Sequence, residues 1–105
     1  MPRPRQASSP RLAPAARIRP VANTSFEIAP GVASETVSAE LQIADSWSLW
    51  GVVPHMHLHG RAIKVSILRA DGGSTCAVDI PRWNFHWQQF YYYVDPVPVG
   101  PGDVI

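Results

Sequence analysis

Three histidines alternate with apolar residues in the segment PHMHLHG, residues 54–60. In an extended chain, side chains two residues apart point to the same side and lie about 6.5 Å apart. The imidazoles of His55 and His57 can therefore converge on one metal ion, and imidazole suits zinc, copper, iron or nickel. His59 would lie about 13 Å from His55. It is predicted to lie beside the metal or on the surface, with Gly60 available to bend the chain.

Two imidazoles are too few for a tightly bound metal ion. A third ligand is expected from His86, from a segment outside these 105 residues, or from another chain. Met56 points away from its neighbouring histidines in an extended chain and is predicted to pack in the core. Cys76 is predicted to be a small packed residue in a strand. It is the only cysteine, so an internal disulfide and a CxxC site are excluded.

Alternation of apolar and polar residues predicts the strands that must position these histidines. Period-two patterns cover residues 36–43, 63–67 and 74–80, and the last two flank a predicted turn at 70–73. A further β-prone run spans 91–94, and three prolines interrupt the chain after it. Eleven prolines and the absence of a 3.6-residue period exclude a helical bundle. We predict an all-β fold, an antiparallel β-sandwich of the jelly-roll kind.

The charged residues divide the chain into two parts. Residues 1–25 carry five arginines and no acidic residue, whereas residues 26–105 carry four basic and eight acidic residues. We predict a disordered Arg/Pro-rich leader at 1–23 and one domain at 24–105. The leader has no aromatic residues for base stacking, so nucleic acid is not an expected partner. It has no apolar stretch of a secretory signal, and no run in the chain approaches the ~20 residues that span a bilayer.

The segment HMHLHGR at 55–61 resembles the H-x-H-x-x-G motif, followed by Lys or Arg, of copper type II, ascorbate-dependent monooxygenases. That family includes the peptidylglycine and dopamine hydroxylating enzymes. The segments around residues 26–31, 79–90 and 96–105 look like those of its bacterial members. The resemblance covers residues 24–105 and corresponds to the first part of the family's C-terminal β-sandwich domain. A strand is predicted to begin near the end of the sequence, so we expect the sandwich to be truncated.

The resemblance implies that His55 and His57 bind the copper that reacts with O2. The family's third ligand at this copper is a methionine further along the chain, here expected beyond Ile105, and its second copper is held by a preceding domain. The implied activity is hydroxylation of a C–H bond in a small organic substrate, with ascorbate as the electron donor, outside the cytoplasm. In the peptidylglycine branch an arginine that recognises the substrate carboxylate stands where this chain has Val53, so peptide amidation is not expected and the substrate is open.

Other classes of protein share parts of this pattern. Multicopper oxidases carry H-P-x-H-x-H-G-H, which resembles residues 56–60, but the leading histidine is absent and Arg61 replaces the closing one. An α-type carbonic anhydrase needs a further strand histidine, and a cupin needs a glutamate soon after the paired histidines. A non-catalytic β-sandwich that binds metal through His55 and His57, or a purely structural module, is the alternative from a different class.

Overall fold

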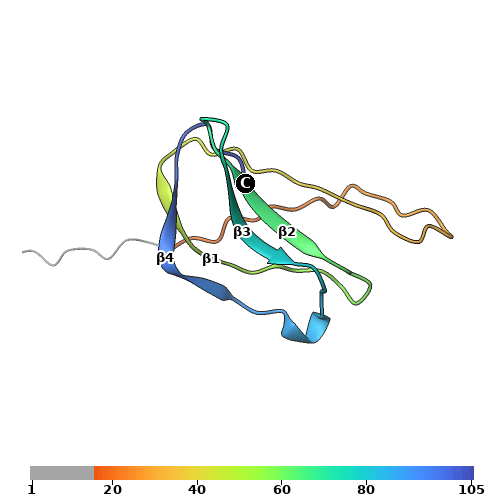
Figure 1. The fold of residues 1–105 in the computed structure, drawn as a ribbon. Coiled ribbons are helices and arrows are strands. Elements are labelled where there is room, and N and C mark those ends of the chain that lie inside the picture. Colours follow the sequence, from red (N-terminus) through yellow and green to blue (C-terminus); the bar gives the residue numbers. More distant parts are fainter. Residues whose placement is uncertain (1–15) are drawn as a thin grey trace, which may run out of the picture.

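The computed structural model describes residues 16–105, which form an all-β chain (Figure 1). The strands pair antiparallel in two two-stranded sheets, β1 with β4 and β2 with β3, so the predicted fold class is confirmed. The β-sandwich and its jelly-roll arrangement stay predictions. The elements are β1 (Trp47–Val52), β2 (Ile63–Leu68), β3 (Ser74–Ile80), the 3-10 helix η1 (Phe85–Trp87) and β4 (Tyr91–Val99).

No helix within residues 16–105 is long and apolar enough to cross a membrane. The predicted leader at 1–23 falls mainly on residues 1–15, which lie outside the described part of the chain. Residues 16–23 are exposed and form neither helix nor strand. Figure 1 shows the orange-to-yellow segment before β1 making a long excursion away from the two sheets.

The β2–β3 hairpin follows directly from the sequence pattern. Its turn closes where Arg69 N–H donates to the Gly73 carbonyl at 2.7 Å and Gly72 N–H donates to the Arg69 carbonyl at 2.9 Å. Gly72 has a φ of 93°, a left-handed conformation that glycine adopts without strain. The predicted turn and the predicted strand at 74–80 are both confirmed.

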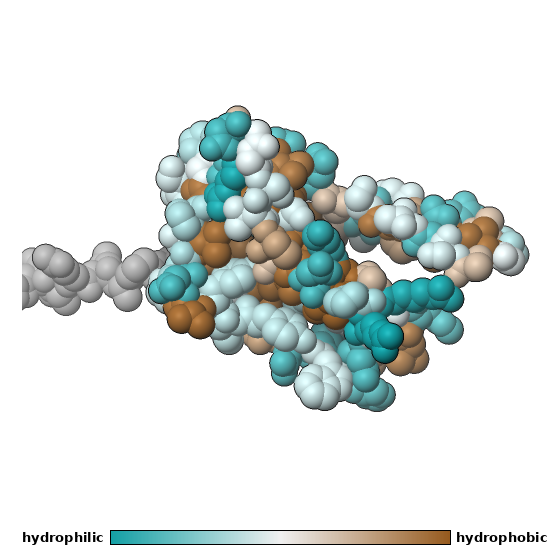
Figure 2. All heavy atoms as spheres, viewed as in Figure 1, coloured by the Kyte–Doolittle hydropathy of each residue, from teal (hydrophilic) through white to brown (hydrophobic). Residues whose placement is uncertain are grey.

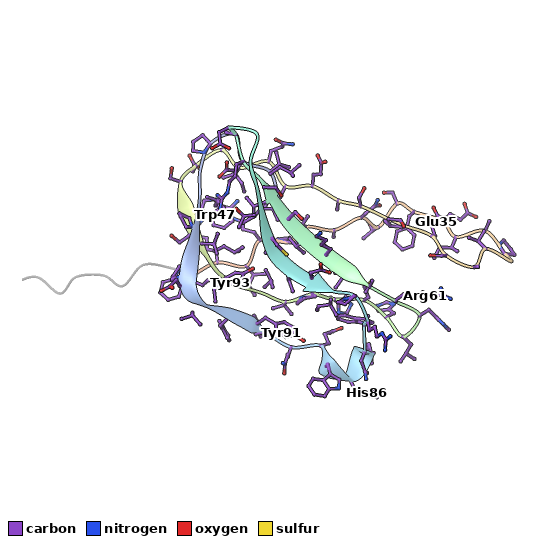
Figure 3. All side chains as sticks on the ribbon, in the orientation of Figure 1. Glu35, Trp47, Arg61, His86, Tyr91 and Tyr93 are labelled. Atoms are coloured by element: carbon purple, nitrogen blue, oxygen red, sulfur yellow. The ribbon has the colours of Figure 1, made fainter. Side chains whose placement is uncertain are left out.

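A β-bulge in this hairpin creates the link between the two sheets. Val65 pairs with Val78 but Ser66 pairs with Cys76, so Ala77 is the extra residue on β3. The hydroxyl of Tyr93, on β4, donates a hydrogen bond to the Ala77 carbonyl at 2.7 Å. Burial raises the pKa of the Tyr93 phenol above its ordinary value, with a smaller contribution from Cys76. Figure 3 labels Tyr93 on its strand.

The small core takes side chains from both sheets. Ile67 of β2 is fully buried, and Ala77 of β3 and Val99 of β4 pack with it, together with Ile43 from the segment before β1. Apolar side chains also reach solvent elsewhere, and in Figure 2 brown spheres are interspersed with polar ones over the visible face. The core is therefore shared between the sheets, but it covers only part of the apolar surface.

The predicted strand at 36–43 is wrong over most of its length. Only Gln42 forms a bridge, with Val104, while residues 36–38 are exposed. Leu41 and Ile105 exchange two backbone hydrogen bonds, of 2.7 and 3.0 Å. A strand needs a partner backbone as well as an alternating pattern, and only the end of the predicted segment meets one.

Val104 also pairs with the end of β2. It exchanges backbone hydrogen bonds with Leu68, of 2.8 and 2.9 Å, and so lies between β2 on one side and Gln42 on the other. The turn before it has Pro101 and Gly102 at its centre, with Asp103 N–H donating to the Gly100 carbonyl at 3.0 Å. Gly102 has a φ of 89°, which fits the third position of a type II turn. A strand was predicted to begin at Val104, and the structure has this residue in two isolated β-bridges instead of a longer strand.

The carboxylate of Asp103 joins this turn to the β2–β3 hairpin. It accepts hydrogen bonds from the backbone N–H of Ala70 at 2.9 Å and of Gly100 at 3.0 Å, and from the Arg69 guanidinium at 3.1 Å. These donors hold the pKa of the Asp103 carboxyl below its usual range, the two backbone N–H groups first. Arg69 also donates to the Pro98 carbonyl at 2.7 Å, so the network reaches the end of β4.

The pairing of β1 with β4 is the part of the fold that the sequence pattern missed. Trp50 is 66% exposed and lies on the solvent side of β1. Because this exposed position is apolar, the sequence of β1 does not alternate between apolar and polar residues. β4 continues past Pro96 and through Pro98, where an interruption was predicted. The register between the two strands shifts after Leu49, where residues of β4 bulge away from β1.

We expect Tyr93→Phe to lower the free energy of unfolding by about 1 kcal/mol, because the Ala77 carbonyl loses its hydrogen-bond donor. Urea denaturation measures this. Tyr92→Phe is the matched control, since Tyr92 is 74% exposed, and it should change stability by less than about 0.5 kcal/mol. Equal effects from both variants would show that the hydroxyl of Tyr93 does not stabilise the sheet contact.

We expect Asp103→Asn to lower the melting temperature at pH 7 by about 5 °C or more. Because folding lowers the pKa of Asp103, its stabilisation is complete above the ordinary carboxyl pKa of about 3.9 and is lost as the pH falls through the lower folded value. The difference between wild type and variant should therefore shrink below about pH 4. Thermal denaturation between pH 7 and 2 measures it, with the exposed Asp45→Asn as control. A constant difference across this range would contradict the argument.

Candidate metal centre

The histidine loop, residues 53–62, connects β1 to β2. β1 ends at Val52, so the histidines lie beyond the strand that was expected to hold them. Pro54 is buried two residues later. Proline has no backbone N–H and restricts the residue before it, which accounts for the end of the β1 ladder at this point.

The rings of His55 and His57 lie close together and are exposed. Their centroids are 5.3 Å apart and the ring planes meet at 89°. Two imidazoles that share a metal ion, with metal–nitrogen distances of about 2.0 Å, have centroids about 5 Å apart at the tetrahedral angle. The separation is compatible with a pair of ligands to one ion, and the metal site at these two histidines stays a prediction.

A turn follows the histidine pair and separates His59 from it. Gly60 N–H donates to the His57 carbonyl at 2.9 Å, so the chain reverses through Leu58 and His59. A Cβ on Gly60 would lie 2.8 Å from the Cβ of Met56, which is closer than any real contact. Met56 is half-buried and packs against this glycine, away from solvent-exposed His55 and His57. The glycine predicted to bend the chain therefore closes the turn.

The structure does not bring a third metal ligand to the pair. Within residues 16–105, no three His, Cys, Asp or Glu side chains are grouped closely enough to hold an ion. His86 is exposed on η1, where its backbone N–H donates to the Asn84 side chain at 3.0 Å and its ring meets Phe85 edge-on. Cys76 is exposed rather than packed, which corrects the sequence-based expectation, because its position on β3 points outward.

The histidine loop is joined to the segment that contains η1. Trp83 N–H donates to the Arg61 carbonyl at 2.7 Å. Figure 3 shows Arg61 and His86 at the same end of the molecule, with Tyr91 at the start of β4. A surface pocket of ≈ 310 Å³ lies in this segment. Its lining residues are Ile80, Arg82, Trp83, Asn84, Trp87 and Tyr91.

The aromatic segment at 83–93 is largely exposed rather than packed in the core. Trp87 is 67% exposed, and Phe90 and Tyr92, which stack with centroids 5.7 Å apart, are more than half exposed. The signal that could have indicated a pocket is the single cation Arg82 at the head of a run of aromatic residues. A small chain has too small a core to bury a long run of aromatic side chains, so part of the run stays exposed.

No family model matches this chain, and neither does any curated protein or solved structure. The assignment of the site therefore depends on the residues of the histidine loop and on their geometry.

We expect Gly60→Ala to weaken metal binding by roughly tenfold. The added Cβ meets the Cβ of Met56, which cannot rotate away, so the loop that holds His55 and His57 must move. Isothermal titration with a divalent or monovalent copper salt measures the affinity. Gly100→Ala is the control, because its added Cβ meets only Ser46 Oγ, at 3.4 Å. An unchanged affinity for Gly60→Ala would mean that the turn does not position the histidines.

Proposed function

We propose that this chain carries part of the copper site of a copper-dependent monooxygenase, with His55 and His57 as two of the ligands. The observation that carries the proposal is the pair of exposed imidazoles with centroids 5.3 Å apart, set in a motif that resembles the copper type II, ascorbate-dependent family. The donor set is compatible with copper, since imidazole binds it well.

The reaction of such an enzyme inserts one oxygen atom of O2 into a C–H bond and releases the other as water. Two electrons and two protons complete the balance, and ascorbate supplies the electrons in the family that the motif resembles. When bound, copper provides the one-electron redox chemistry that lets O2 react. His55 and His57 would hold the ion, and the turn at Gly60, against which Met56 packs, positions the two histidines.

The exposure of both rings supports a site that is completed from outside residues 16–105. Both histidines are exposed to solvent, so a further ligand, a second copper domain and a substrate can approach from that side. The family that the motif resembles uses a methionine as its third ligand and works outside the cytoplasm, and we propose both for this protein.

A second candidate is a metal-binding module without catalytic activity. The observation that favours it is the lack of a third His, Cys, Asp or Glu ligand beside the pair in the described residues. The two candidates differ in what copper does once it is bound. An enzyme consumes O2 and ascorbate in proportion to a hydroxylated product, whereas a binding module retains copper without turnover.

The proposal is tested by anaerobic titration of the full 105-residue chain with Cu(I) against a chromogenic chelator. We expect about one copper per chain for wild type and none for the His55→Ala/His57→Ala double variant, because removing both imidazoles leaves no paired donors. Equilibrium dialysis followed by metal analysis gives an independent stoichiometry.

The controls are His59→Ala and His86→Ala, which remove exposed histidines outside the pair. Both should bind copper within about threefold of wild type. If the double variant binds as wild type does, or if wild type binds no copper, the histidine pair is not a metal site. Loss of binding in His86→Ala alone would place the ligand on η1 instead.

A further inference from the structure

The pocket between the end of β3, η1 and the start of β4 has the chemistry of a binding site. Its volume of ≈ 310 Å³ lies at the lower end of the range for small-molecule sites. Its aromatic walls come from Trp83, Trp87 and Tyr91 and its aliphatic wall from Ile80. The Tyr91 hydroxyl donates to the Trp87 carbonyl at 3.1 Å, which holds two of these walls together.

Two polar side chains of the pocket, Arg82 and Asn84, offer hydrogen-bond donors. Arg82 is exposed, and no carboxylate in residues 16–105 forms an ion pair with it. Asn84 accepts a hydrogen bond from the His86 backbone through Oδ1, so its amide Nδ2 is the group left to a ligand. No acidic residue lines the pocket. The nearest acid in sequence, Asp79, lies 4.0 Å from the ammonium group of Lys64.

Trp83 adds a third donor that the chain does not satisfy. Its Nε1 is buried and has no hydrogen-bond partner, and it is the only such side-chain atom in the part of the chain that the structure describes. A buried donor without an acceptor is rare in native proteins and often marks a missing water, ion or ligand.

We propose that this pocket binds a small aromatic carboxylate. The guanidinium of Arg82 matches a carboxylate through its planar pair of donors. The ring of the ligand would lie against the indoles of Trp83 and Trp87, since aromatic rings prefer offset or edge-on contact with one another. Because Arg82 lines the pocket and no acidic residue does, the pocket favours a carboxylate over an amine. Its aromatic walls favour flat rings over aliphatic acids of equal charge.

The pocket is connected to the histidine loop by the hydrogen bond from Trp83 to Arg61. The statement that an aromatic carboxylate is the substrate of a monooxygenase rests on the function proposed for the histidine pair. The statement that it is a ligand of the pocket depends only on the residues that line the pocket. The two statements are separated by measuring binding to the metal-free chain.

The test is a titration of the metal-free, ¹⁵N-labelled full chain with 2-naphthoate, followed by the indole N–H signals of its four tryptophans. We expect the signals of Trp83 and Trp87 to move and those of Trp47 and Trp50 to stay, with each signal assigned from its Trp→Phe variant. Arg82→Gln should weaken binding at least tenfold. Arg61→Gln, an exposed arginine outside the lining, should bind as wild type.

Matched probes decide which feature of the ligand is recognised. Naphthalene-2-carboxamide keeps the ring without the charge, and cyclohexanecarboxylate keeps the charge without the ring, so both should bind at least tenfold more weakly. Equal binding of the amide, movement of the Trp47 or Trp50 signals instead, or no movement at millimolar 2-naphthoate would each overturn the proposal.

The His55→Ala/His57→Ala variant should retain 2-naphthoate binding, because neither histidine lines the pocket. Loss of copper binding with retained 2-naphthoate binding would remove the proposed function and leave the pocket assignment intact. Copper binding without 2-naphthoate binding would remove the pocket assignment and leave the proposed function intact. A loss of 2-naphthoate binding in the double variant would contradict the pocket as the site, provided the amide spectrum shows that the variant is folded.

Discussion

The carboxylate of Asp103 is the junction on which the arrangement of the chain depends. It accepts hydrogen bonds from two backbone N–H groups and from the Arg69 guanidinium, and that arginine also reaches the end of β4. One buried charge thus connects the tip of the β2–β3 hairpin to the turn that follows β4. Burying a carboxylate without hydrogen-bond donors costs free energy, so Asp103 must lie where these three donors meet. This places Val104 between β2 and Gln42.

Little apolar area is buried between the two sheets, and hydrogen bonds from Tyr93 to Ala77 and from Arg69 to Pro98 also connect them. Within residues 16–105 the core has four buried apolar residues, centred on Ile67. The Ala77 carbonyl, displaced from its ladder by the bulge, is satisfied by Tyr93 of the opposite sheet. A chain of this size can bury only a limited apolar surface. A hydrogen bond between the sheets therefore contributes more to fixing how they pack against each other.

The histidine loop and the aromatic pocket lie at the same end of the molecule. The histidine loop leaves β1 at a proline, presents two imidazoles to solvent and returns through a glycine turn that Met56 packs against. The backbone bond from Trp83 to Arg61 ties that loop to the aromatic pocket beyond β3. The histidine pair and the aromatic pocket thus lie on segments joined by a backbone hydrogen bond. This juxtaposition supports the proposal of a copper site that acts on a small organic molecule.

The sequence alone determined the features that depend on residues close together in the chain. The all-β class, the β2–β3 hairpin with its glycine turn and the pairing of His55 with His57 follow from periodicity and short spacing. Tertiary structure decided what depends on distant partners. The strand predicted at 36–43 formed only where residues 103–105 lie beside it. β1 and the proline-containing part of β4 formed because each supplies the other with a backbone partner. The pocket around Trp83 arises from segments on both sides of η1. A local pattern specifies which face of a strand is apolar. Only the folded chain brings a partner strand beside it, or brings separate segments together to line a pocket.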